Sequence, residues 1–376
     1  MSNLIVVEDM AAPSVVRRGG QALMVLQHLQ GLARLGHRVL FVEFLDAEPD
    51  PSAVGWFEDV MRDWWSIDQS ALLVAPSYES RAGVSASDVA AAASDADAVI
   101  TISAHYRREP WPFIDQVRPR ILIDEDPAYT HLWAEGSDPV DIFGEHDVYF
   151  TVGGNVGSSR SRLPLLGIDW HTTWNPVVLD LWPTTIAMRN ARFGTVAGLR
   201  DYGWLDFEDA CFGPKVEELR KFASLPKLTG ESFEILADLE PDDPDRQEFE
   251  AAGWIFGSPE RVAQPSMYQD YVRGGAGEFS VAKGGYVGTH SGWFSDRSAA
   301  YLASGRPVVV QATGFEDLLP VGEGLFAVDD VDAAAAAIVA VRRDPGRHAA
   351  AARRIAEQHF DSNRILTTIL ATAGVD

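Results

Sequence analysis

The sequence contains a single cysteine and far fewer basic than acidic residues. Cys211 has no second cysteine to pair with, so a disulfide within the chain is excluded and a reducing, cytoplasmic location is expected. The 31 Lys and Arg residues are set against 55 Asp and Glu residues, which gives a formal charge of −24 at pH 7. A field of that sign repels nucleic acid and anionic lipid. Nucleic acid is therefore not an expected partner, and an anionic ligand would need a local cluster of cations.

Long apolar runs are missing as well. No window reaches the roughly 18 apolar residues that a membrane helix requires, and the first residues lack the basic region and apolar run of a signal peptide. A soluble protein without a membrane span is expected. The chain has 376 residues, of which 46% are hydrophobic. This length predicts two domains, each large enough to have its own core.

The first half alternates short apolar runs with helical patterns. Residues 4–8 and 37–43 are predicted strands, and between them residues 21–35 form an amphipathic helix. A strand–helix–strand unit of this kind predicts a right-handed crossover and a parallel sheet. Gly19 and Gly20, just before the helix, allow the backbone to approach a ligand closely at its N-terminus. A Gly-Gly pair before a helix is also common as a simple turn.

The second half repeats this alternation from residue 193 onward. The predicted organisation is an N-terminal α/β domain over residues 1–180 and a C-terminal α/β domain over residues 190–355, joined by a Trp- and Pro-rich connection. Residues 356–376 still carry apolar positions at helical spacing, including Ile365, Leu366 and Leu370. They predict a final helix that crosses back to the N-terminal domain.

Residues 289–310 form the most informative stretch. Ser295 is a good N-cap, Gly305 a good helix stop, and residues 308–311 a β-branched run suited to a buried parallel strand. Arg297 lies in the first turn of the helix, where the helix dipole disfavours a cation, and His290 lies just before it. A phosphate between these two side chains would explain the arrangement. A solvated arginine and a histidine at the edge of the core is the other interpretation.

Three motifs in this region carry a resemblance to a known family. They are His-Ser-Gly-Trp (residues 290–293), Ala-Ser-Gly-Arg-Pro-Val-Val-Val (303–310) and Thr-Gly-Phe-Glu (313–316). Together they resemble the nucleotide-sugar segment of GT-B glycosyltransferases. The resemblance is close over residues 284–320 and extends to both halves in the order of elements. It implies two Rossmann-like, doubly wound domains facing a cleft. It also implies metal-independent transfer of a sugar from a nucleotide-diphosphate donor, without any other cofactor.

The resemblance also implies a donor site. In the family, the N-terminus of the helix in this segment holds the donor diphosphate, and the loop after the next strand contacts the sugar. A Gly-Gly pair faces the donor from the N-terminal domain. Retaining members place an Arg and then a Lys after the first strand of the second domain; Arg200 matches, and Lys215 matches if an insertion separates them. The expected donor-binding residues are Gly19, Gly20, Arg200, Lys215, Glu278, His290, Ser291, Gly292, Asp296, Arg297, Thr313, Gly314, Phe315 and Glu316.

Two residues of the first half are expected to line the acceptor side and to be catalytic. His105 and Asp126 each follow a predicted strand, and ligands of open α/β sheets bind at the carboxyl ends of strands. Asp124-x-Asp126 also matches the DxD metal motif of the other glycosyltransferase fold. Carboxylates beside a turn proline are common, however, and the rest of the chain fits GT-B. No metal site is expected.

Departures from the family pattern leave alternatives open. Many retaining members carry two glutamates eight residues apart, at the positions that Gly292 and Ala300 occupy here. Asp296, one turn before Ala300, is a possible substitute. Retention is favoured because the loop after the first strand has no histidine base, although Asp9 or Glu8 would serve an inverting enzyme. A sugar-nucleotide epimerase of the same fold and an inactive partner subunit of a glycosyltransferase are the other candidates.

Overall fold

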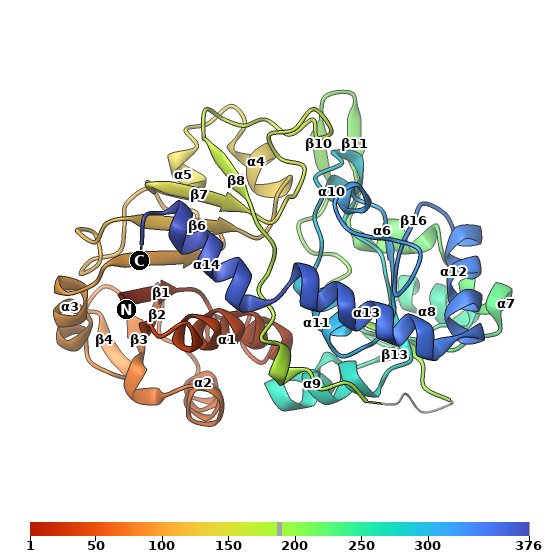
Figure 1. The fold of residues 1–376 in the computed structure, drawn as a ribbon, viewed down its shortest axis with the longest axis horizontal. Coiled ribbons are helices and arrows are strands. Elements are labelled where there is room, and N and C mark those ends of the chain that lie inside the picture. The colour runs from red at the N-terminus through yellow and green to blue at the C-terminus, as the bar shows by residue number, and fades with distance from the viewer. Residues whose placement is uncertain (186–189, 376) are drawn as a thin grey trace.

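The chain folds into two α/β units that lie side by side (Figure 1). The computed structural model describes residues 1–185 and 190–375. The N-terminal unit is built on an eight-stranded sheet in the order β4-β3-β2-β1-β5-β6-β7-β8, in which β4 is antiparallel to β3 and the other pairs are parallel. Its strands are β1 (Asn3–Val7), β2 (Arg38–Leu45), β3 (Ser70–Val74), β4 (Glu79–Gly83), β5 (Ala98–Ile102), β6 (Arg120–Asp124), β7 (Val148–Thr151) and β8 (Trp170–Thr172).

Helices cover this sheet, and its central strands are correspondingly apolar. Strands β3, β5 and β6 are buried along their whole length, as expected where both faces of a parallel sheet are covered. The helices of the unit are α1 (Gly19–Arg34), α2 (Pro51–Trp64), α3 (Ala86–Ser94), α4 (Tyr129–Ala134) and α5 (Val140–Phe143), with a 3-10 turn η1 (Ile67–Gln69).

The C-terminal unit has a parallel six-stranded sheet in the order β13-β12-β9-β14-β15-β16. Its strands are β9 (Phe193–Val196), β12 (Phe233–Leu236), β13 (Ile255–Gly257), β14 (Gly277–Ser280), β15 (Val308–Gln311) and β16 (Leu325–Val328), and a separate hairpin joins β10 (Leu205–Phe207) to β11 (Ala210–Phe212). Its helices are α6 (Lys215–Arg220), α7 (Leu225–Thr229), α8 (Pro244–Ala252), α9 (Pro265–Gly274), α10 (Gly284–Gly288), α11 (Asp296–Ala303), α12 (Val331–Arg343) and α13 (Pro345–His359). The 3-10 turns η2 (Leu179–Leu181), η3 (Pro259–Val262) and η4 (Phe315–Asp317) lie in the connections.

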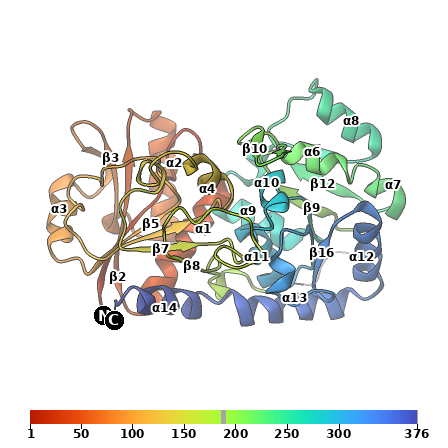
Figure 2. The ribbon, with the colours of Figure 1, turned by 90° about the horizontal axis from the view of Figure 1, so that it is seen from above.

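A pair of helices at the end of the chain spans both units. Helix α13 packs against α11, and α14 (Ser362–Thr372) packs against α1 of the N-terminal unit. Figure 2 shows the two helices running along one side of the molecule and the chain ends lying close together. Phe360, between the two helices, contacts Trp174 at a ring distance of 5.8 Å and Phe294 at 5.3 Å. The end of the chain therefore holds the two units together.

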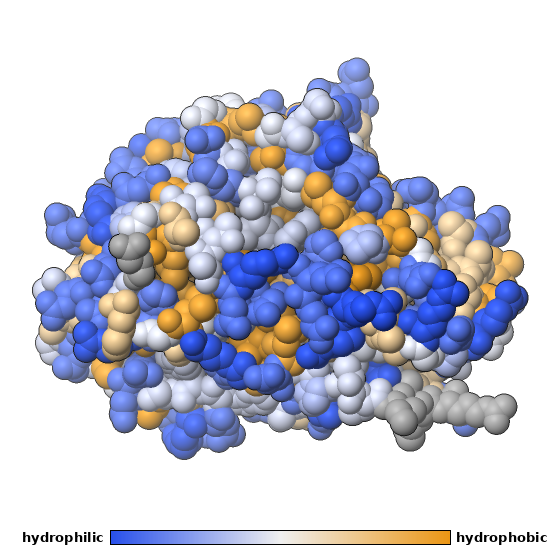
Figure 3. All heavy atoms as spheres, viewed as in Figure 1, coloured by the Kyte–Doolittle hydropathy of each residue, from blue (hydrophilic) through white to orange (hydrophobic). Residues whose placement is uncertain are grey.

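The surface agrees with the acidic composition. Hydrophilic side chains predominate on the face of Figure 3, with apolar side chains in scattered patches. Within residues 1–185 and 190–375, no helix is both long enough and apolar enough to cross a membrane.

Candidate functional site

A cavity of about 310 Å³ lies between the two units, where the carboxyl ends of their strands face each other. The loops that follow β1, β5 and β6 line it from the N-terminal side, and Arg18 and Gln21 line it at the start of α1. Tyr202, Trp293 and Asp296 line it from the C-terminal side. This is the place where open α/β sheets bind ligands, and we refer to it below as the cleft.

The cleft is acidic. Its lining includes Glu8, Asp9, Glu125, Asp126 and Asp296, and the one Lys or Arg among the described residues that line it is Arg18. Burial raises the pKa of Glu8 well above its usual value, and the charges of Asp9 and Glu125 raise it further. Burial also raises the pKa values of Asp9 and Glu125. These acids therefore hold protons more tightly than free carboxylates do.

Asp126, an expected catalytic residue, joins the two units. Its carboxylate accepts hydrogen bonds from the hydroxyls of Tyr202, at 2.8 Å, and Tyr286, and Lys283 Nζ lies 3.4 Å from Oδ1. Lys283 Nζ also lies 3.4 Å from the centre of the Tyr202 ring, a cation–π contact. Burial alone would raise the pKa of Asp126, but Lys283 and the two hydroxyls outweigh it, and the pKa is lowered. Both carboxylate oxygens are thus engaged by the C-terminal unit. Asp126 lines the cleft, and its catalytic role stays a prediction.

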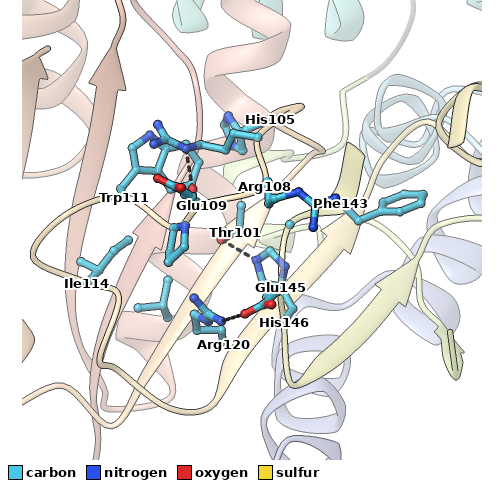
Figure 4. A pocket seen from close by; sticks show the side chains of 14 residues that line it. Thr101, His105, Arg108, Glu109, Trp111, Ile114, Arg120, Phe143, Glu145 and His146 are labelled. Carbon is cyan, nitrogen blue, oxygen red and sulfur yellow. Dashed lines mark hydrogen bonds and ion pairs between the residues drawn. The ribbon is translucent and has the colours of Figure 1, made fainter. Parts of the chain in front are cut away.

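His105, the second expected catalytic residue, points away from the cleft. Ser103, Ala104 and Tyr106 line the cleft, whereas His105 lines a separate cavity of about 30 Å³ within the N-terminal unit. Figure 4 shows His105 on one side of this small cavity and Arg120 with His146 on the other. The expectation that His105 itself lines the acceptor side is therefore corrected.

The His105 ring is held in place on two sides. Its Nε2 contacts the carbonyl of Ile102 at 3.1 Å, and its Nδ1 lies 3.9 Å from Oδ1 of Asp9. Burial lowers the pKa of His105, so the ring is more often neutral than a free histidine. Through Asp9 the histidine still contacts a side chain that lines the cleft.

Arg297 does have an anion beside it, and that anion belongs to the protein. Its Nε donates to Glu278 Oε1 at 2.6 Å, its Nη1 to the carbonyl of Val196 at 2.8 Å and its Nη2 to Ser280 Oγ at 2.9 Å. Ser295 caps α11 as expected, accepting from Arg297 N at 3.2 Å. Glu278 pairs with the arginine, and the ring of His290 contacts Asp317 Oδ2 at 3.0 Å. A phosphate between His290 and Arg297 stays a prediction.

Several of the expected donor-binding residues lie at the interface between the two units. The carbonyl of Ser291 accepts from Asn155 N at 3.0 Å, and Asn155 Nδ2 donates to the carbonyl of Gly314 at 3.1 Å. Gly292 has φ 75°, and a Cβ added to it would lie 2.6 Å from Asn155 N. A glycine is therefore required at position 292, where the resembled family carries a glutamate.

The loop after β15 is built by its own polar groups. Thr313 Oγ1 donates to the carbonyl of Trp293 at 2.6 Å, and Glu316 Oε2 accepts from Gly314 N at 3.1 Å. Phe315 packs against Phe294 with ring centres 5.0 Å apart. A role of Thr313, Phe315 and Glu316 in donor binding stays a prediction.

The Gly-Gly pair faces the other unit of the protein. A Cβ on Gly19 would lie 2.4 Å from the carbonyl oxygen of Val262 and 2.5 Å from that of Gln264, and one on Gly20 would lie 2.8 Å from the ring of Tyr268. The close approach that these glycines allow is therefore to η3 and α9, which corrects the expectation that it is to a ligand. The start of α1 still borders the cleft through Arg18 and Gln21.

Arg200 and Lys215 lie in different surroundings. Arg200 is at the surface, where it bridges to Asp243 at 2.6 Å and to Asp245. Its place in the donor site stays a prediction. The β10–β11 hairpin lies between it and Lys215. The match of Lys215 to the lysine of the family stays a prediction.

Lys215 is a buried cation without a carboxylate to pair with. It is 6% exposed, at the start of α6. Burial, and then repulsion by Arg297 and Lys283, lower its pKa to about 7. Its Nζ forms no ion pair with any residue that the structure describes. Arg297 and Lys283 are close enough to Lys215 to lower its pKa, and we refer to these three residues below as the cation cluster.

Comparison with known proteins defines the fold. No protein-family model matches the sequence, and no curated protein is similar to it. Solved structures do match. Anabaena HepE bound to UDP and glucose superposes with a TM-score of 0.61 at 13% identity, over 100% of both chains. An alpha-glucosyltransferase bound to UDP superposes with a TM-score of 0.59 at 12% identity, over 99% of each chain.

A third structure agrees with these two. AviGT4, a glycosyltransferase involved in avilamycin A biosynthesis, superposes with a TM-score of 0.53 at 12% identity, over 100% of this chain and 97% of that one. The chain therefore has the GT-B glycosyltransferase fold, with two Rossmann-like domains, which confirms the fold class expected from the sequence.

Proposed function

We propose that the protein is a glycosyltransferase that moves a sugar from a uridine-diphosphate sugar to an acceptor bound in the cleft. The observation that carries this proposal is the buried, unpaired Lys215 within the cation cluster. Burial, and then the charges of the two other cations, lower its pKa to about 7, and a bound anion would favour the charged lysine again. The protein has a net charge of −24, so three neighbouring cations in its interior are unusual. A bound anion would stabilise them. A diphosphate fits that requirement, and HepE and the alpha-glucosyltransferase were each solved with UDP.

The cation cluster would contribute most to the departure of the diphosphate. Negative charge on the leaving group grows as the sugar–phosphate bond breaks, so fixed cations beside it stabilise the transition state more than the ground state. Arg297 is oriented by Glu278, Val196 and Ser280, and Lys283 by Asp126 and Tyr202, so both are held before a ligand binds. Lys215 is the member whose charge is free for the ligand. We propose that this stabilisation takes the place of a metal ion.

We further propose that transfer retains the configuration of the sugar. An oxygen of the donor diphosphate then takes the proton of the acceptor hydroxyl. The name of the structural neighbour alpha-glucosyltransferase supports retention, because UDP-glucose is itself an α-linked donor. The pair formed by Asp9 and His105 is the observation that favours inversion, since a carboxylate oriented by a histidine at the edge of the cleft resembles a general base. The anomeric configuration of the product, read by NMR, distinguishes the two.

The donor site can be tested by calorimetry with UDP. Replacing Lys215 by Met keeps the length of the side chain and removes the charge, so UDP affinity should fall by about tenfold to hundredfold, the equivalent of roughly 1.5–3 kcal/mol for one charge-assisted contact. Lys227→Met, at an exposed position of α7, is the matched control and should leave the affinity unchanged. Equal UDP affinity in wild-type protein and Lys215→Met would contradict the proposal.

Turnover separates the transferase from the alternatives. A transferase releases UDP from UDP-glucose faster when an acceptor is present, an epimerase converts the sugar without releasing UDP, and an inactive partner subunit binds UDP without turnover. Activity that persists in EDTA is expected because the cation cluster replaces the metal.

A further inference from the structure

The N-terminal wall of the cleft has the wrong charge for a nucleotide sugar. Glu8, Asp9 and Glu125 lie on this wall, and the charges of Asp9 and Glu125 are close enough to Glu8 to raise its pKa. The cation cluster on the other side does not neutralise them, because Lys283 is paired with Asp126 and Arg297 with Glu278. A ligand that fills the cleft therefore meets acids on this wall that no neighbouring cation among the described residues neutralises.

Two of these acids have oxygen atoms without a partner. Glu8 is 3% exposed, and its Oε2 finds no hydrogen-bond donor in the described part of the chain. The Oε1 atom of Glu125 is also buried and has no hydrogen-bond donor among residues 1–185 and 190–375. Its Oε2 atom accepts a hydrogen bond from Asn175 Nδ2 at 2.9 Å. Buried polar atoms in folded proteins are nearly always hydrogen-bonded, and leaving one unpaired costs about 1–3 kcal/mol. Both residues line the cleft, so a ligand can supply the missing donors.

The chemistry of that ligand follows from the number and charge of the unpaired groups. A protonated amine donates up to three hydrogen bonds and brings a positive charge, so it can donate to both oxygens and favours the ionised form of both carboxylates. A metal ion would need at least three suitable ligands, and no such group of His, Cys, Asp or Glu is arranged among the described residues. A neutral hydroxyl donates a single hydrogen bond and leaves the charges uncompensated.

We propose that the acceptor carries a protonated amine, which binds between Glu8 and Glu125 on the N-terminal wall of the cleft. The proposal rests on the proposed transferase function and specifies its acceptor as an amine-bearing sugar or polyol. The amine is the group that is recognised, and a hydroxyl of the same molecule is the nucleophile. Asn175 donates to Oε2 of Glu125 and so orients the carboxyl group of Glu125.

The test uses the full chain saturated with UDP, in buffer of pH 7 with 150 mM salt. Binding of glucosamine and galactosamine is compared with that of N-acetylglucosamine and N-acetylgalactosamine by saturation-transfer NMR titration. The amines should bind at least tenfold more tightly than their acetylated forms. In Glu125→Gln this preference should fall to within about threefold, and Glu8→Gln should show the same loss if Glu125→Gln does not fold. Glu135→Gln, at an exposed residue after α4, is the matched control and should keep the preference.

The outcomes separate the two proposals. Equal binding of amines and acetylated sugars by protein that binds UDP would overturn the amine proposal and leave the donor proposal standing. A preference for amines that persists in both Glu125→Gln and Glu8→Gln would also overturn it, because the amines would then be bound by the acidic surface in general. Protein that fails to bind UDP would contradict the proposed function itself.

Discussion

Arg297 of α11 and Glu278 of β14 form an ion pair of 2.6 Å in the interior of the C-terminal unit. The glutamate side chain is 0% exposed and the arginine side chain 10%. A cation in the first turn of a helix is unfavourable when alone. Here it is neutralised by a carboxylate on the strand beside it and hydrogen-bonded to Val196 and Ser280.

This pair leads to a first prediction about stability. Arg297→Ala should lower the free energy of unfolding by about 3–5 kcal/mol, because it leaves Glu278 buried without its partner. The double variant Arg297→Met with Glu278→Leu should recover part of that loss. Arg62→Ala, which removes an exposed pair with Asp59, should cost at most about 1 kcal/mol. Urea unfolding of the four proteins measures these values, and a loss in Arg297→Ala no larger than that in Arg62→Ala would contradict the prediction.

The same pair shows why part of the sheet could not be predicted. Residues 274–280 have the composition of a Gly-rich loop, yet residues 277–280 are β14, a central strand. Glu278 is tolerated in a buried strand because Arg297, 19 residues further along the chain, donates a hydrogen bond to its carboxylate. Residues 286–288 likewise begin with an apolar pair that would suit a strand, yet they belong to the short helix α10. Local composition does not reveal such tertiary partners.

Strands without such partners were predictable. Residues 98–102 and 308–311 are apolar β-branched runs, and both are strands buried on each face. Ser295 and Gly305 mark the ends of α11 by rules that act within one turn of helix, and both expectations are confirmed. Local physics therefore accounts for most of the fold.

The site was less predictable than the fold. Asp126 and His105 each follow a strand, and this position correctly predicts that they lie near the cleft. It does not predict where their side chains point, because that depends on residues far away in the sequence. Lys283, which engages Asp126, is 157 residues away in sequence. The unpaired oxygens of Glu8 and Glu125 also have no sequence signal, since their burial arises from tertiary packing. For Lys215 the sequence did offer a signal, its position after Arg200, although its role in donor binding stays a prediction.

A second prediction concerns the contact between α1 and the C-terminal unit. Gly19→Ala should lower the melting temperature, because its Cβ would meet two backbone carbonyl oxygens that cannot rotate away. Gly55→Ala is the control within another helix, α2, where nothing lies within 4 Å of the added Cβ. It should be neutral or stabilising by up to about 1 kcal/mol, the helix preference of Ala over Gly. Thermal unfolding that ranks Gly19→Ala level with Gly55→Ala would refute the close packing of α1.

A third prediction concerns the contact between Asp126 and Lys283. Asp126→Asn should lower the free energy of unfolding by about 1.5–3 kcal/mol at pH 7, the value of hydrogen bonds to a charged group. The pKa of Asp126 is lowered in the folded protein, so its contribution is present above the unfolded value near 3.9 and is lost as pH falls through the lower folded value.

The difference between wild type and Asp126→Asn should therefore shrink when urea unfolding is repeated at successively lower pH below about 4. Asp59→Asn, at an exposed residue of α2, should show at most about 1 kcal/mol at either pH. A difference for Asp126→Asn that stays constant with pH would show that the carboxylate charge does not hold the units together.

The last prediction concerns Glu43, a fully buried carboxyl group beneath the loop that follows β1. Its oxygens accept hydrogen bonds from Ala11 N and Ala12 N at 2.8 Å, so it positions the loop that carries Asp9. Burial raises the pKa of Glu43 to about 8, and the charge of Asp9 also raises it. The backbone N–H donors lower the pKa, but by less. The pKa of Glu43 is higher in the folded than in the unfolded protein. The stability that Glu43 contributes is therefore fully present below about pH 4.5 and is lost as pH rises through about 8.

The stability of the wild type should therefore fall with rising pH across this window, by up to about 1.4 kcal/mol per pH unit from this residue. Glu43→Gln has no proton to release and keeps an oxygen for the two backbone donors, so its stability should decline less steeply over the same range. Urea unfolding at pH 5, 6, 7 and 8 gives both slopes, and Glu357→Gln on the exposed side of α13 should retain the wild-type slope. Parallel curves for wild type and Glu43→Gln would show that Glu43 is ionised throughout, and that the two backbone N–H groups outweigh its burial.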